Sequence, residues 1–283
     1  MWPITPTAHS AATSFKLCIS RIRDPDLKLR LNACAGLIET AEQLYTTAAA
    51  TGTLHTLRQA DFTPAPPTTD DELKSVYTDR MANKKAPGRR IYDDIIMTAP
   101  HERCPLCGHR SVATLDHHLP KAKYPALAVT PSNLIPACSD CNKAKLDGAP
   151  ATAEEETLHP YFDDVSGDLW LAARVIRTAP AAVAFSVQAP PHWSPTLTKR
   201  VELHFQTFGL AKLYAAQAGQ ELGNIRFGLG EIHDADPLHS AALVRDELLR
   251  QARTRRKAHI NSWQTALYQA LADSDWFCDG GFA

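Results

Sequence analysis

The sequence of 283 residues lacks several features that mark particular classes of protein. It has no excess of positive charge, because 30 lysines and arginines face 31 acidic residues and the formal net charge is −1. The charge balance therefore disfavours a strongly basic protein that binds nucleic acid tightly without a partner. No apolar run approaches the roughly 20 residues that span a bilayer, so we expect no membrane partner. Residues 1–6 show no basic flank before an apolar stretch, so we expect no signal peptide and a cytoplasmic protein.

The composition is that of an ordinary globular protein, and the chain carries no internal repeat. Hydrophobic residues make up 44% and charged residues 22%, and a sizeable core is possible at this length. We expect an α+β fold, mostly helical, around a small module. Three regions are predicted: a helical N-terminal region (1–99), a cysteine- and histidine-rich module (100–165), and a hairpin with a helical C-terminal region (166–283).

Hydrophobic periodicity and turn signals predict the elements outside the module. Two strand-like runs on either side of Pro180 favour a β-hairpin. The remaining apolar positions recur mostly at helical spacing. The expected helices cover 11–22, 25–50, about 70–81, 90–98, about 195–218, 238–257 and 261–273, and the expected strands cover 169–176 and 183–188.

Four of the seven cysteines form two Cys-x-x-Cys pairs that flank a histidine-rich stretch. An odd total with two such pairs is not typical of a secreted disulfide framework. Four thiolates can hold one tetrahedral zinc, and a closed shell of four sulfurs indicates a structural rather than a catalytic ion. Two unrelated cysteine pairs are the alternative. The predicted zinc ligands are Cys104, Cys107, Cys138 and Cys141.

Between and after these pairs lie residues suited to phosphodiester hydrolysis. The sequence reads Asp-His-His-Leu-Pro-Lys at 116–121, Asn-Leu at 133–134 and Cys-Asn-Lys-Ala-Lys at 141–145. Such hydrolysis needs an activated water and a cation that stabilises charge at phosphorus. Histidine is the natural base near neutral pH, and carboxylate and amide oxygens suit Mg²⁺ or Mn²⁺.

This combination resembles the zinc-knuckle branch of the HNH (ββα-metal) endonucleases over roughly 45 residues. The resemblance implies a strand near 114–117, a long loop, a strand near 134–137 and a helix from about 139. By position, His117 resembles the general base and Asp116 a metal ligand. Asn133 resembles the residue that braces the loop, and Asn142 takes the third motif position as a second ligand. Histidine is common there, and the asparagine favours Mg²⁺ over a zinc- or nickel-type site.

Some of these assignments have plain structural alternatives. His117 could be a structural histidine in a degenerate module, and His118 is better explained by packing or a phosphate contact than by catalysis. His159, in a His-Pro-Tyr segment after the module, is a further candidate metal ligand or a residue that packs a turn.

Short basic stretches are candidates for phosphate contacts. Ordinary solvated side chains are the alternative for them. A cationic cluster at 250–257 is interpreted as the basic end of a helix, which offsets the helix dipole. Nothing in the sequence indicates readout of base edges. The predicted nucleic-acid contacts are Lys121, Lys145, Lys85, Arg89 and Arg90.

These features together predict an endonuclease that hydrolyses DNA with Mg²⁺ or Mn²⁺. The helical N-terminal region, the motif at 116–121 and the His-Pro-Tyr segment are similar to bacterial HNH proteins of anti-phage systems. In Septu-type systems such a nuclease works with an ATPase subunit, so the resemblance implies an ATPase partner. Two alternatives stay open: a ribonuclease with the same centre, and a non-catalytic, zinc-dependent nucleic-acid-binding or scaffold subunit.

Overall fold

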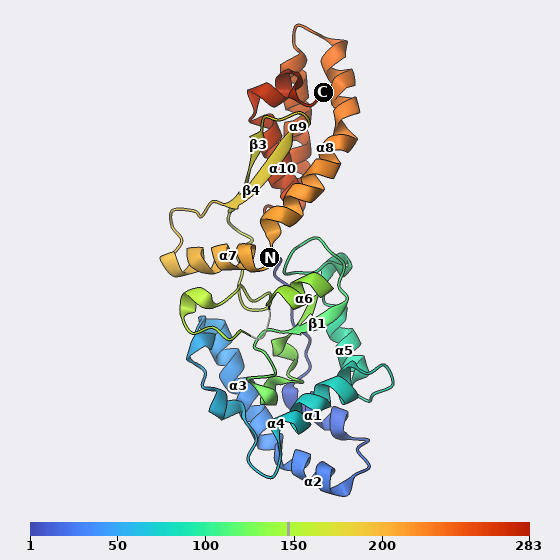
Figure 1. Cartoon of the computed structure of the whole chain (residues 1–283), viewed down its shortest axis with the longest axis vertical. Helices are drawn as coiled ribbons and strands as arrows, with labels where there is room; N and C mark the ends of the chain where they lie inside the picture. Colours follow the sequence, from blue (N-terminus) through green and yellow to red (C-terminus); the bar gives the residue numbers. More distant parts are fainter. Residues whose placement is uncertain (146–147) are drawn as a thin grey trace. The chain divides into compact units, whose positions relative to one another are not determined.

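The structure is a computed structural model that describes residues 1–145 and 148–283. The chain divides into two compact units, Met1–Asp164 and Val165–Ala283, whose elements are labelled in Figure 1. Helices predominate in both units, and each unit holds one two-stranded antiparallel sheet. The expected α+β class is therefore confirmed. Across the described residues, no helix combines the length and apolar character needed to cross a membrane.

Five helices precede the cysteine-rich module, and side chains cap several of their starts. Ser10 and Asp24 accept bonds from backbone N–H groups of the first turns, and Thr69 forms a capping box with Glu72. The single helix expected over 25–50 is divided at Cys34, whose N–H bonds to the carbonyl of Leu31 and closes the first helix. The helices are α1 (Ala11–Ile19), α2 (Pro25–Ala33), α3 (Ala35–Thr51), α4 (Asp70–Tyr77) and α5 (Arg89–Ile96).

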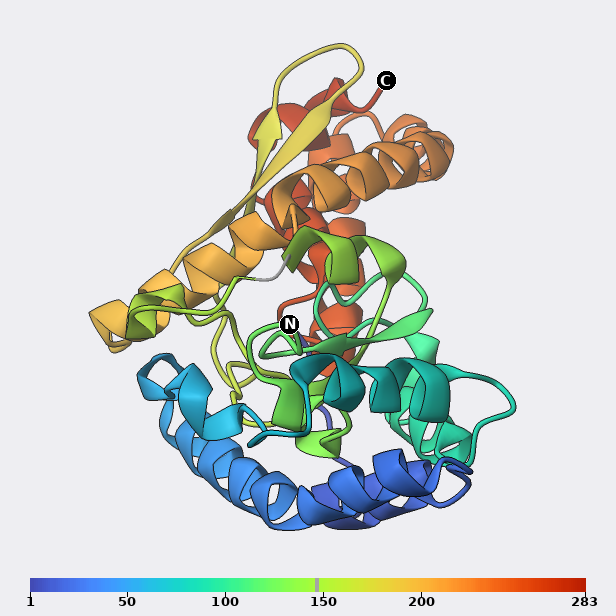
Figure 2. The ribbon, with the colours of Figure 1, turned by 60° about the horizontal axis from the view of Figure 1, so that its bottom comes forward.

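The N-terminal helices and the module share one hydrophobic core. Phe15 and Ile38 come from the helices, while Leu115, Leu127 and Leu134 come from the module, and all five belong to the same buried cluster. In Figure 2, α1–α3 line one side of this unit. The compact unit Met1–Asp164 therefore spans the predicted region 1–99 and nearly all of the predicted region 100–165.

The module has the element order ββα. Strand β1 (Thr114–His117) pairs with β2 (Leu134–Ala137), and helix α6 (Ser139–Lys145) follows. The strands run antiparallel, with Asp116 opposite Ile135 and His117 opposite Leu134. These bounds match those implied by the resemblance. Because β1 ends at His117, the two motif residues stand where the strand gives way to the loop.

The second unit is a hairpin packed on helices. Strand β3 (Leu171–Ile176) packs on α10 and β4 (Ala182–Val187) on α8. The helix expected over 195–218 is interrupted at Gly209, whose φ of 59° lies in the left-handed region that glycine adopts without strain. The helices of this unit are α7 (Pro195–Thr207), α8 (Leu210–Ala235), α9 (Ser240–Ala258) and α10 (Trp263–Ala272).

Candidate functional site

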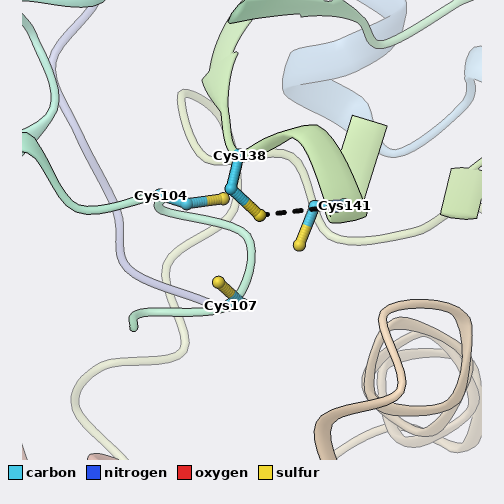
Figure 3. Close-up of side chains that lie close together, drawn as sticks. All are labelled: Cys104, Cys107, Cys138 and Cys141. Atoms are coloured by element: carbon cyan, nitrogen blue, oxygen red, sulfur yellow. Dashed lines mark hydrogen bonds between the residues drawn. The ribbon is translucent and has the colours of Figure 1, made fainter. Parts of the chain in front are cut away.

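The four predicted zinc ligands form one buried cluster. Their sulfur atoms all lie within 4.8 Å of one another, and Figure 3 shows them turned toward a common centre. Tetrahedral zinc with bonds of about 2.3 Å places its sulfurs roughly 3.8 Å apart, so the cluster fits such an ion. Among the described residues, the cluster consists of these four thiols alone, and the neighbouring His101 and His109 are outside it.

Backbone groups and charge also suit a cation at this cluster. The N–H groups of Arg110 and Cys141 donate to the sulfurs of Cys107 and Cys138. Hydrogen bonds with Cys104 lower the pKa of Cys107, and they lower that of Cys138 to about 6. The pKa values of Cys104 and Cys141 are raised by hydrogen bonds with their neighbours in the cluster. Thiols this close cannot all ionise unless a cation joins them.

A segment that the sequence did not connect with the cysteines covers the first pair. The N–H of Trp2 donates to the carbonyl of Pro105 at 2.8 Å. Gly108 has a φ of 62°, and a Cβ added there would lie 2.8 Å from the indole nitrogen of Trp2. Glycine is therefore required at this turn both by its backbone conformation and by the adjacent indole. No local sequence pattern indicates this contact.

Asp116 and Lys145 form a buried ion pair at the end of β1. Only 6% of Asp116 is exposed, and the Nζ of Lys145 donates to its Oδ2 at 2.9 Å. The same ammonium donates to the carbonyls of His117 at 2.7 Å and His118 at 2.5 Å. Burial raises the pKa of Asp116 and lowers that of Lys145, while their mutual attraction opposes both shifts. Three acceptors occupy the three N–H donors, so the structure uses Lys145 internally and not as a surface phosphate contact.

His117 is held as a neutral imidazole. Its Nε2 lies 2.9 Å from the carbonyl of Ala128, and because a carbonyl only accepts, Nε2 carries the proton and Nδ1 the lone pair. The ring also meets the edge of Tyr77, at 4.4 Å between centroids. Burial lowers the pKa of His117 to about 3, and the charges of Lys121 and Lys145 act in the same direction. At neutral pH the ring is therefore uncharged, and Nδ1 keeps its lone pair.

Asn133 braces the loop that joins the two strands. It is fully buried, its Oδ1 accepts the N–H of Leu119 at 2.7 Å, and its Nδ2 donates to the carbonyls of Leu119 and Leu127. Its own carbonyl accepts the N–H of His118 at 2.8 Å. The side chain of Asn133 thus ties the start of the loop to its later part, and its backbone carbonyl holds His118, the residue that follows His117.

Asn142 lies on helix α6, which contacts β1. It is three residues before Lys145 on the same helix, and residues so spaced share a face. Since Lys145 reaches Asp116 from that face, the amide of Asn142 and the carboxylate of Asp116 belong to facing elements. Asn142 is half-buried. The pair offers two oxygen ligands of the kind that Mg²⁺ prefers.

His159 is engaged through both ring nitrogens. Its Nδ1 accepts the N–H of Tyr161 at 3.1 Å, and its Nε2 lies 2.8 Å from the hydroxyl of Tyr45. The residue is 1% exposed and stacks near His118. A metal would need a lone pair that these bonds occupy, so the arrangement favours packing over ligation for His159.

The predicted phosphate contacts fall into two groups. Arg89 is held by Asp93 and the carbonyl of Ala82 and lies over the ring of Tyr92, so its guanidinium is already bonded to groups of the protein. Lys85 and Arg90 are exposed. Lys121 lies 4.6 Å above the ring of Tyr77, the same ring that meets His117.

Replacing Asn133 with alanine is expected to destabilise the first unit by roughly 2–4 kcal/mol, because it leaves buried polar groups of the loop without partners. Thermal unfolding of the full-length protein checks this. The matched control is Asn83→Ala, which removes an exposed bond to the N–H of Lys85. Equal melting temperatures for the two variants would contradict the bracing role.

Comparison with known proteins agrees with this geometry. Residues 104–148 match the HNH endonuclease family. The chain is 29% identical over 257 residues to Protein ea31 of Escherichia phage lambda, covering 84% of this chain and 86% of that protein. No solved structure matches. Residues 104–148 therefore form an HNH endonuclease domain built around a cluster of four cysteines.

Proposed function

We propose that this protein is an endonuclease that hydrolyses DNA phosphodiester bonds with Mg²⁺ or Mn²⁺. The observation that carries the proposal is the state of His117, a neutral imidazole oriented by Ala128 whose Nδ1 can take a proton. Beside it, Asp116 and Asn142 supply oxygen ligands for a hard cation. A carboxylate has about four lone-pair sites, so the bond from Lys145 leaves Asp116 acceptor capacity for that cation.

In the proposed reaction, His117 removes a proton from a water molecule as the water oxygen attacks phosphorus. The new bond joins oxygen to phosphorus, one ester oxygen leaves and takes a proton from solvent, and the proton on His117 returns to solvent. Asn133 bonds the carbonyl of Leu127, and so holds the loop beside Ala128, whose carbonyl orients the imidazole. A divalent cation held by Asp116 and Asn142 would stabilise the charge that develops on the phosphate. Lys121, Lys85 and Arg90 remain the proposed phosphate contacts.

The His117→Ala variant is expected to cleave DNA about 10²- to 10⁴-fold more slowly than wild type, since it loses general-base catalysis. Plasmid DNA and RNA are each incubated with the two proteins, with Mg²⁺ and with a chelator. His239→Ala, which removes an exposed histidine of the second unit, is the matched control and should cleave like wild type.

The outcomes separate the alternatives. Cleavage of RNA but not DNA identifies a ribonuclease with the same centre. Identical behaviour of wild type and His117→Ala on every substrate would contradict the enzyme proposal. It would favour the non-catalytic, zinc-dependent binding or scaffold subunit instead.

We further propose that the four-cysteine cluster holds one structural Zn²⁺. Its support is the closed, buried set of four sulfurs. Metal analysis of the full-length protein is expected to find one zinc per chain, and Cys104→Ser is expected to lose it and lower the melting temperature. Cys278→Ser changes a buried thiol of the second unit and should keep the zinc. Wild-type protein without zinc would contradict the proposal.

A role in bacterial anti-phage defence with an ATPase partner is the third part of the proposal. It is supported by the resemblance to HNH proteins of such systems. The net charge of −1 also supports it, because a protein without excess positive charge would rely on a partner for part of its binding to DNA. Affinity purification from the native host should then recover an ATPase, and deleting the gene should raise phage plaque counts. Recovery of the protein alone, with unchanged plaque counts, would contradict this role.

A further inference from the structure

A buried polar pair connects helix α3 with the turn that follows the module. Tyr45 on α3 is 0% exposed and His159 is 1% exposed, and their Oη and Nε2 atoms lie 2.8 Å apart. Because Nδ1 of His159 accepts the N–H of Tyr161, Nε2 carries the proton and donates to the Tyr45 hydroxyl. The hydrogen bond therefore has a defined direction and a fixed ring orientation.

The His159 ring packs against His118, the residue after the proposed base. The two ring centroids are 4.1 Å apart, and Phe162 meets the His159 ring at 4.7 Å. His118 in turn provides the N–H bonded by Asn133 and the carbonyl bonded by Lys145. A shift of the His118 ring would thus disturb two backbone bonds that hold the end of β1.

The segment after His159 holds the second strand. The hydroxyl of Tyr161 donates to the carbonyl of Leu134 at 2.9 Å, and Leu134 lies opposite His117 in the hairpin. Asp163 accepts the N–H of His159 at 2.7 Å and so stabilises the turn. Residues 159–163 therefore contact Leu134 at the start of β2 and His118, the residue that follows β1.

Stability alone does not explain a buried tyrosine and histidine here. Replacing both members of a buried hydrogen bond with apolar groups of similar shape is often nearly neutral. A fully satisfied polar contact instead specifies one arrangement of the groups around it. Tyr45 fixes the orientation of the His159 ring, and the His159 ring packs against that of His118, so this contact helps to define where the His118 ring lies.

We propose that Tyr45 and His159 are positioning residues that hold the end of β1. Helix α3, which carries Tyr45, would then help to orient the residues of the nuclease centre. This inference rests on the proposed nuclease function for its effect on turnover. Its effect on the strand end can be measured without turnover.

The test combines hydrogen exchange with kinetics on full-length Tyr45→Phe and His159→Gln. The amides of His118 and Leu119, both bonded to Asn133, are expected to exchange at least ~10-fold faster in either variant. The kcat for DNA is expected to fall about 10-fold while KM stays within about twofold, because orientation and not substrate binding is lost. Zinc content should not change.

Tyr268→Phe is the matched control, since it removes a tyrosine hydroxyl bonded to Glu221 at 2.6 Å in the second unit. It should leave exchange at residues 118 and 119 and kcat at wild-type values. Unchanged exchange in Tyr45→Phe, or faster exchange with unchanged kcat in an active enzyme, would overturn the inference. If wild type cleaves nothing, the nuclease proposal fails by itself, and the exchange rates alone decide whether the pair holds the strand end.

Discussion

Side chains on a β-strand alternate between its two faces, and this constraint governs the candidate centre. Asp116 and His117 are adjacent, so they can serve one reaction only where the strand ends. The structure ends β1 at His117 and holds that end from three directions. Lys145 reaches it from α6, Asn133 from the loop, and His159 from the turn after the module.

The buried ion pair shows why this end is held by polar contacts. Removing charges from water costs several kcal/mol, and a buried pair often contributes little net stability against an apolar substitute. Lys145 nevertheless uses its full set of donors on Asp116 and two carbonyls. Lys145 instead fixes the position of α6, which carries Asn142, relative to β1, which carries Asp116. The two cation sites proposed for this domain are thus of opposite kinds: the four sulfur atoms would enclose one ion, and the oxygen atoms of Asp116 and Asn142 would bind the other.

The local parts of this domain could be predicted from the sequence, and the long-range parts could not. Spacing alone paired Cys104 and Cys107 with Cys138 and Cys141, because two-residue loops let each pair bind the same ion. Lys145 was predicted to contact a phosphate. Its neighbours in the sequence do not indicate that its side chain turns inward to Asp116. Tyr45 and His159 are 114 residues apart, and nothing in the sequence around either residue indicates their contact. Gly209 interrupts the region 195–218, which the spacing of its apolar residues predicted to be one continuous helix.

The most direct measurement is anomalous diffraction from crystals of the full-length protein grown with Mn²⁺. The two-site account predicts a zinc signal among the four sulfurs and a separate manganese signal between Asp116 and Asn142, in contact with their side-chain oxygens. Manganese bound only elsewhere, or one metal shared by the cysteine cluster and no second site, would contradict it.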